Sequence, residues 1–209
     1  PTEWRREGVF PRGTAVPHVD YLPARALHQQ LSKVTRFQSA RAFSYMFSPG
    51  FEPLRRQVAI RMRDAGVVVG PADVVITHGC VDALQMSLRV LTKPGDLIAT
   101  ESPTYYGLLQ LADLLGLKVI EIPSDPTTGI SLEALQLAAS QWSIKALVLT
   151  ARLSNPLGGT IPEDRQKQLL RMAGNFDIQI VEDDIYGELM FEQGPSKALK
   201  ASDKEGRVV

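Results

Sequence analysis

Two consecutive aspartates, Asp183 and Asp184, follow an apolar stretch at 178–182. Carboxylates at the end of a buried strand are costly unless they meet a cation, a metal or a protonated ligand nitrogen. Tyr186 lies three residues after Asp183 and brings a phenol to the same place. The pattern therefore predicts that at least one of the two acids has a functional partner.

Three other polar segments follow apolar stretches. His78 to Asp82 form a turn that runs into a helical pattern, and a glycine at such a position lets backbone N–H groups point at an anion. Tyr105 and Tyr106 can stack on a planar ligand or fill a core. Asn155, before a proline, offers an amide donor in a turn. Each of these segments also has a purely structural interpretation.

Taken together, the four segments favour one ligand. They offer a phosphate site, an aromatic face, an amide donor, and a carboxylate with a phenol nearby. Pyridoxal phosphate needs all four, because its phosphate must be anchored, its ring stacked, its phenolic oxygen hydrogen-bonded and its pyridine nitrogen kept protonated. The sequence therefore predicts pyridoxal 5'-phosphate as the cofactor.

The elements that must position these residues alternate between strand and helix. An irregular arm with a short helix around 24–35 comes first, and a helical pattern runs from Glu52 until Gly66 stops it. The predicted strands are 74–77, 97–101, 118–122, 146–150 and 178–182. The predicted helices between them are 81–91, 106–115, 131–139 and 162–173. Short apolar strands separated by helices indicate a buried, largely parallel sheet, whose ligands bind beyond the carboxyl ends of the strands.

Composition excludes several classes of protein. The 209 residues carry 23 Lys and Arg against 23 Asp and Glu, so a nucleic-acid surface within this segment is not expected. One cysteine, Cys80, indicates a reducing compartment, and no apolar run approaches a membrane span. The three histidines are too scattered for a metal site. We therefore expect a cytoplasmic protein without a membrane partner, built around one large α/β domain.

Five segments carry a family resemblance across nearly the whole chain. They are SPGFEPLRRQVAIRMRDAGV, ITHGCVDAL, PGDLIATESPTYYG, NPLGGTIPEDRQKQLL and VEDDIYGEL. In this order they resemble the fold-type-I, pyridoxal-phosphate-dependent aminotransferases. The segments ESPTYYGLLQ, NPLG and EDDIYGELMF look most like the aminotransferase-like domain of the MocR subgroup of GntR transcriptional regulators. In that subgroup the domain is joined to a winged helix.

The resemblance implies roles for individual residues. Asp183 pairs with the pyridine nitrogen, Tyr186 and Asn155 hydrogen-bond the phenolic oxygen, and Tyr105 stacks on the ring while Tyr106 packs. The phosphate cradle consists of Gly79, Cys80 and Val81. Tyr45 reaches the phosphate of a partner subunit, which implies a homodimer, and the segment from Gly13 to Pro23 crosses near the substrate entrance.

The resemblance also implies a fold and its extent. We expect a three-layer α/β/α aminotransferase-like large domain with a mainly parallel sheet, truncated at its C-terminal end. Residues 1–50 are the N-terminal arm and dimer-contact segment, and residues 51–209 are a partial cofactor-binding domain. Since further strands would follow Val209, the outer edge of the sheet at 178–182 should lack some of its backbone partners.

Catalytic residues are not expected in this chain. The family's Schiff-base lysine lies on a strand that would begin at about Arg207, and Lys197, Lys200 and Lys204 are interpreted as solvated loop residues. Arg152, next to the Asn155 turn, could point toward the site, but we expect a surface salt bridge for it. Cys80 would be a stabilised thiolate at a helix N-terminus, yet no recognised His and acid motif makes it a nucleophile.

Two functions remain open at the level of sequence. The leading hypothesis is a domain that senses an amine or amino-acid-like effector in a regulator that contacts DNA only through a winged-helix domain outside this chain. The alternative is a fragment of an aminotransferase acting on an amino acid. A winged helix encoded upstream would favour the regulator. A Rossmann-like nucleotide binder is disfavoured, because the G-x-G-x-x-G pattern is missing.

Overall fold

The computed structural model describes residues 17–190 and 197–209, which form two compact units that divide between Met46 and Phe47. The first unit contains a 3-10 turn, Val19–Tyr21, and the helices α1 (Ala24–Phe37) and α2 (Ser39–Ala42). The helix expected at 24–35 is therefore present, and the short α2 was not anticipated. Residues 1–16 of the predicted arm lie outside the described residues.

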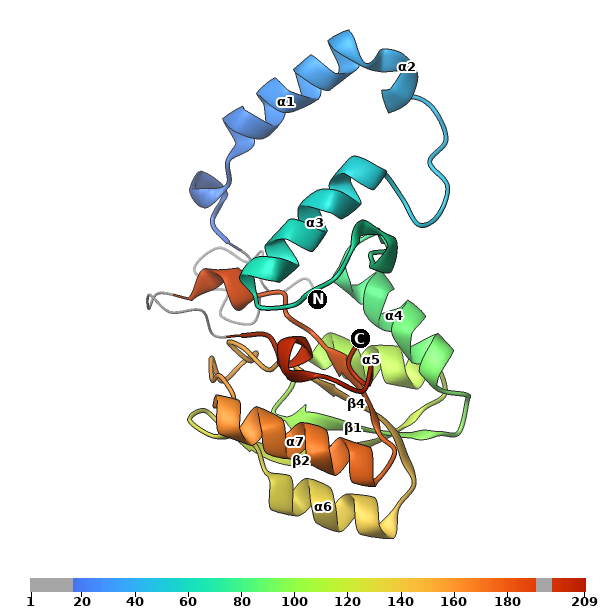
Figure 1. Ribbon diagram of the computed structural model, residues 1–209, viewed down its shortest axis with the longest axis vertical. Helices are drawn as coiled ribbons and strands as arrows, with labels where there is room; N and C mark the ends of the chain where they lie inside the picture. Colours follow the sequence, from blue (N-terminus) through green and yellow to red (C-terminus); the bar gives the residue numbers. More distant parts are fainter. Residues whose placement is uncertain (1–16, 191–196) are drawn as a thin grey trace, which may run out of the picture. The chain divides into compact units, whose positions relative to one another are not determined.

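The second unit is built on a five-stranded sheet in the order β3-β2-β1-β4-β5 (Figure 1). Its strands are β1 (Leu97–Ser102), β2 (Lys118–Asp125), β3 (Gly129–Ile130), β4 (Ile144–Leu149) and β5 (Gln179–Glu182). The pairs β1–β2, β1–β4 and β4–β5 are parallel, while the short β3 runs antiparallel to β2. Four of the five predicted strands are confirmed.

Helices cover both faces of this sheet (Figure 1). On one face, α4 (Cys80–Leu91) and α5 (Tyr106–Leu114) bury Leu84, Leu88 and Leu111 against apolar sheet residues. On the other face, α6 (Leu132–Gln141) and α7 (Glu163–Asn175) bury Leu135 and Leu169 in a second core cluster. The sheet is therefore buried on both sides, and the three-layer α/β/α architecture is confirmed.

The helix α3 (Glu52–Asp64) precedes the sheet and ends as the sequence predicts. Gly66 has a positive φ of 84°, and the Val67 N–H donates to the Met62 carbonyl oxygen at 2.9 Å. A glycine in this left-handed conformation turns the chain, so that the N–H groups that follow the helix can bond to carbonyl groups without a partner in its last turn.

The predicted strand at 74–77 is wrong. The segment is extended but irregular between the 3-10 turn Pro71–Asp73 and α4, and Val75 is 58% exposed. Its Ile76 N–H donates to the Pro49 carbonyl oxygen, and no described strand lies beside it. An apolar, β-branched run becomes a strand only when a neighbouring strand completes the hydrogen-bond ladder, which the local pattern does not specify.

The outer edge of β5 is paired, contrary to expectation. The Ile180 N–H donates to the Arg207 carbonyl oxygen at 2.8 Å, and the Glu182 N–H donates to the Val209 carbonyl oxygen at 2.9 Å. At Val208 the N–H donates to Oδ2 of Asp203, and the carbonyl accepts from Lys200 Nζ. Residues 207–209 thus continue the sheet beyond β5. The side chains of Asp203 and Lys200 bond to the N–H and the carbonyl of Val208, the middle residue of this segment.

No helix in residues 17–190 and 197–209 is both long and apolar enough to cross a membrane.

Candidate functional site

The N-terminus of α4 lies at the carboxyl end of the sheet. Gly79 is the residue before the helix, with φ of 104°, and a Cβ added to it would meet nothing within 4 Å. The Asp82 side chain accepts from the His78 N–H at 3.0 Å and so fixes the turn that leads into the helix. The first N–H groups of a helix have no intrahelical acceptors, so Gly79, Cys80 and Val81 offer donors beside an open space.

Cys80 contacts the acid that the sequence singled out. Its thiol donates to Oδ1 of Asp183 at 3.3 Å, and Asp183 directly follows β5. Burial raises the pKa of the Cys80 thiol to about 12, and the charge and hydrogen bond of Asp183 contribute in the same direction. The expectation of a stabilised thiolate is therefore wrong, because burial and the neighbouring carboxylate both favour the protonated thiol.

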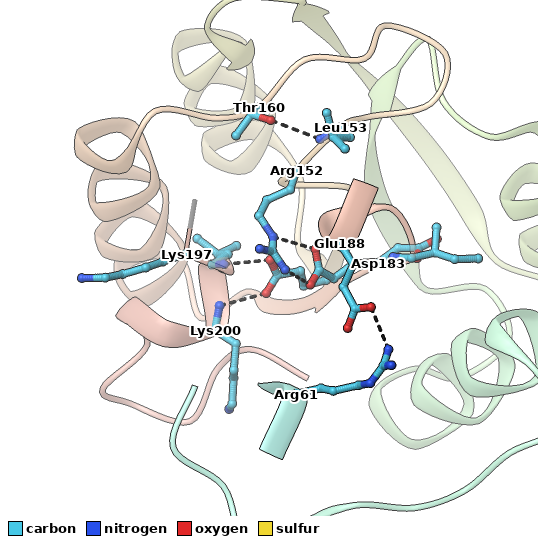
Figure 2. A network of polar contacts seen from close by, with 12 residues as sticks. Arg61, Arg152, Leu153, Thr160, Asp183, Glu188, Lys197 and Lys200 are labelled. Carbon is cyan, nitrogen blue, oxygen red and sulfur yellow. Dashed lines mark hydrogen bonds and ion pairs between the residues drawn. The ribbon is translucent and has the colours of Figure 1, made fainter. Parts of the chain in front are cut away.

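Asn155 and Tyr186 are brought together across two loops. Asn155 Nδ2 lies 3.5 Å from the Tyr186 hydroxyl oxygen, a long hydrogen bond. The Asn155 loop is closed by the Ser154 N–H, which donates to the Gly159 carbonyl at 2.8 Å, and by the Leu153 N–H, which donates to Thr160 Oγ1 at 3.2 Å (Figure 2). The Asn155 amide and the Tyr186 phenol therefore lie side by side.

The paired tyrosines differ in their surroundings. Tyr105 is half-buried immediately before α5, and its ring lies over Gly107, where a Cβ would overlap the ring. Tyr106 is 59% exposed and does not pack into the core, which corrects its expected role. The two rings lie at a tilt with their centroids 5.1 Å apart. The role of Tyr105 as a stacking residue stays a prediction.

Arg152, which Figure 2 labels, forms an ion pair with Asp184, the second aspartate. It is 5% exposed, its Nε donates to Oδ1 of Asp184 at 2.8 Å, and its Nη2 contacts Oδ2 of the same carboxylate. The expected salt bridge is present, but the expectation that Arg152 lies on the surface is wrong. Arg152 is interior because it closely follows the buried end of β4, while the Asp184 side chain is 30% exposed.

The acid before the two aspartates anchors another segment. Both oxygens of Glu182 accept backbone N–H groups, from Leu199 at 2.7 Å and from Lys200 at 2.8 Å. They cap the 3-10 turn Leu199–Ser202. Burial raises the pKa of Glu182, although these N–H groups oppose the change. Lys200 is half-buried and bonded to Asp203, so it is not a solvated loop residue, whereas Lys197 and Lys204 are exposed.

Glu101 is a site residue that the sequence interpretation missed. It lies in β1, is 2% exposed, and accepts from the Thr150 N–H at 2.9 Å. Burial raises its pKa to about 7, and the nearby charge of Asp183 contributes to the increase. The sequence held one clue to this residue, because Glu101 is an acid at the end of the apolar stretch LIATE.

Tyr45 belongs to the first unit and is 92% exposed there, so its contact with a partner subunit stays a prediction. In the described part of the chain, no group of three or more His, Cys, Asp or Glu side chains could hold a metal ion.

A model of the aminotransferase class I and II family matches residues 20–208. The chain belongs to that family. Among similar proteins, the HTH-type transcriptional regulators YjiR and YdcR of Escherichia coli K12 are 41% and 33% identical, over 96% and 98% of this chain. Aromatic-amino-acid aminotransferase 1 of Thermococcus litoralis is 33% identical over 93% of the chain. The chain spans 43%, 44% and 48% of the lengths of these three relatives.

Solved aminotransferase structures share the fold. Kynurenine aminotransferase of Pyrococcus horikoshii, solved with PMP, superposes with a TM-score of 0.85 at 32% identity, over 93% of this chain and 49% of that one. LysN of Thermus thermophilus, an α-aminoadipate aminotransferase complexed with N-(5'-phosphopyridoxyl)-L-leucine, gives 0.85 at 28% identity, over 93% and 49%. The cofactor that goes with this aminotransferase family is pyridoxal 5'-phosphate.

The geometry of this family member fits that cofactor. The open space beside Gly79 at the N-terminus of α4 suits a phosphate, and the Asp183 carboxylate suits a protonated ring nitrogen. Asn155 and Tyr186 lie close enough for both to donate to one oxygen. The residues present therefore match the donors and acceptors that the group requires.

Proposed function

We propose that this chain is the cofactor-binding part of an effector-sensing domain in an HTH-type transcriptional regulator. The observation that carries the proposal is the contact between Cys80, at the N-terminus of α4, and Asp183, at the end of β5. It supports a site where an anion-binding helix end and a carboxylate lie side by side. The similarity to YjiR and YdcR, both named as HTH-type regulators, supports the regulatory setting.

The residues divide the work of holding pyridoxal phosphate. The N–H groups at Gly79, Cys80 and Val81 receive the phosphate, and Asp183 keeps a proton on the ring nitrogen. Bound pyridoxal phosphate supplies an electron sink for an amino group attached to it. Because the Cys80 thiol stays protonated, it can donate to Asp183 and hold that carboxylate in place.

Around this site we propose further assignments. Asn155 and Tyr186 donate to the phenolic oxygen, and Tyr105 stacks on the ring. Residues 1–50 act as the arm and dimer-contact segment, with Tyr45 reaching the cofactor phosphate of a partner subunit in a homodimer, and residues 51–209 contribute to the cofactor domain. The effector is an amine or an amino-acid-like molecule, DNA is bound by a separate domain of the parent protein, and the parent protein is cytoplasmic.

The test uses the full-length parent protein and titrates pyridoxal phosphate by its absorbance. Asp183→Asn is expected to weaken binding strongly, because the amide no longer carries the charge that favours a protonated ring nitrogen. Asp177→Asn, in an exposed loop at the opposite end of β5, is the matched control. Equal affinity in the wild type and Asp183→Asn would refute the cofactor site.

An aminotransferase is the second candidate, favoured by the 33% identity to aromatic-amino-acid aminotransferase 1. The two candidates differ in what an added amino acid does to the parent protein. With a second oxo acid supplied as the amino-group acceptor, an enzyme converts the amino acid to the corresponding oxo acid over many turnovers. A regulator instead changes its affinity for operator DNA. Measuring oxo-acid release and DNA binding in the same preparation separates them.

A further inference from the structure

The ion pair between Arg152 and Asp184 joins the two loops that carry the proposed cofactor contacts (Figure 2). Arg152 lies three residues before Asn155, and Asp184 lies between Asp183 and Tyr186. The strand ends behind the loops are already tied, because the Asp183 N–H donates to the Leu149 carbonyl at 2.9 Å. Within the turn after Asp183, the Gly187 N–H donates to the Asp184 carbonyl at 3.3 Å and the Ile185 N–H donates to Oδ1 of Asp183 at 3.3 Å, and the ion pair adds a side-chain contact to the loop that faces it.

The contact is suited to fixing a direction. Arg152 uses Nε and Nη2 against the two oxygens of one carboxylate, and a planar guanidinium in this two-point arrangement restricts orientation more than a single ammonium contact would. Gly187 is buried against the pair, and a Cβ there would overlap both the guanidinium and the carboxylate. The turn thus closes onto the ion pair only because residue 187 lacks a side chain.

The pair also separates the tasks of two adjacent acids. The Asp184 carboxylate is engaged by Arg152, while the Asp183 carboxylate meets Cys80. If the turn rotated, Asp183 and Tyr186 would change their directions together, because only two residues separate them. The Arg152 side chain is buried while the Asp184 side chain is 30% exposed, and such a pair is poor evidence for stability alone, because desolvation opposes the attraction.

We propose that Arg152 and Asp184 are positioning residues that set the directions of Asp183 and Tyr186 toward the cofactor. The inference rests on the proposed cofactor site and adds to it two residues that need not touch the cofactor. Their effect reaches the ligand through the 183–187 turn and the facing Asn155 loop.

The test measures pyridoxal phosphate affinity in the full-length parent protein for Arg152→Gln, Asp184→Asn and Gly187→Ala. Each is expected to weaken binding by about tenfold, the scale typical of residues that orient a ligating side chain. Arg152→Lys should not restore affinity, because an ammonium lacks the two-point geometry. Arg207→Gln is the matched control, since Arg207 pairs with Asp177 and Glu205 at the opposite end of β5.

A second readout separates positioning from general stabilisation. Arg152→Gln is combined with Tyr186→Phe, and the effects on affinity should be non-additive because both act through the same turn. The pH at which the absorbance of the bound cofactor changes should also move in the Arg152 variant and not in Arg207→Gln. Additive effects with an unchanged pH midpoint would show a merely structural role and overturn the inference.

The outcomes remain distinguishable from failure of the cofactor site itself. If Asp183→Asn weakens binding while the three ion-pair variants bind within about twofold of wild type, only the positioning inference fails. If wild type and Asp183→Asn bind alike, the site proposal fails. Should Arg152→Gln not fold, Asp184→Asn preserves side-chain shape and decides by the same two readouts.

Discussion

The Sγ atom of Cys80 lies 3.3 Å from Oδ1 of Asp183, although 103 positions separate the two residues in the sequence. The first residue of α4 and the first residue after β5 therefore meet at the carboxyl end of the sheet. This contact affects the protonation state of the thiol as well as the direction of the carboxylate.

The folded protein should protect Cys80 from alkylation. Because burial and Asp183 raise the thiol pKa to about 12, little thiolate forms at a pH near 9.0, which is the ordinary pKa of a thiol. Iodoacetamide labelling at that pH should be much slower in the folded chain than in denaturant, and Cys80 is the only cysteine. Asp183→Asn should accelerate labelling of the folded chain. Equal rates in the folded and denatured wild type would contradict the prediction.

Glu101 should make stability depend on pH. Its folded pKa of about 7 exceeds the ordinary 4.5, so between these values the folded chain binds more protons than the unfolded chain. Stability should therefore fall as pH rises through this window, by up to about 3 kcal/mol, and then level off. Urea unfolding of wild type and Glu101→Gln across the window measures the slopes, and the variant should lose this component. Parallel curves would rule out Glu101 as the source.

Gly159 should be less tolerant of a side chain than its neighbour. A Cβ at Gly159 would overlap the Pro126 backbone, so Gly159→Ala should destabilise the fold by about 2 to 3 kcal/mol. Gly158 has open space but a positive φ of 70°, and Gly158→Ala should cost about 1 kcal/mol. Thermal and urea unfolding compare the two variants, and a smaller loss for Gly159→Ala would show that the loop can move aside.

Asp203 should protect the edge of the sheet. Asp203→Ala removes the acceptor of the Val208 N–H and the partner of Lys200, and should lower stability by about 1 to 2 kcal/mol. Hydrogen exchange at Val208 should quicken, and sedimentation should show more association, because unpaired edge groups pair with other chains. Lys204→Ala, at an exposed neighbouring position, is the control. Unchanged exchange at Val208 would show that the side chain does not cap the edge.

The sequence by itself determined the alternation of strands and helices and the end of the sheet at which the polar residues gather. Short apolar stretches between helical segments predicted β1, β2, β4 and β5, and residues that follow parallel strands must meet at one edge. Asp183 and Asn155 could thus be assigned to the same site from the sequence. These features depend on local patterns, which neighbouring residues encode.

Only the tertiary structure decided which groups contact each other. It placed Arg152 in the interior against Asp184, gave Glu101 a buried position with a raised pKa, and used Lys200 to satisfy the Val208 carbonyl. It also left 74–77 without a described strand beside it. Such outcomes depend on residues that are distant in sequence, because their positions set the burial, charge and hydrogen bonding of each site residue. A local pattern of apolar and polar residues does not specify which distant residue will lie beside it.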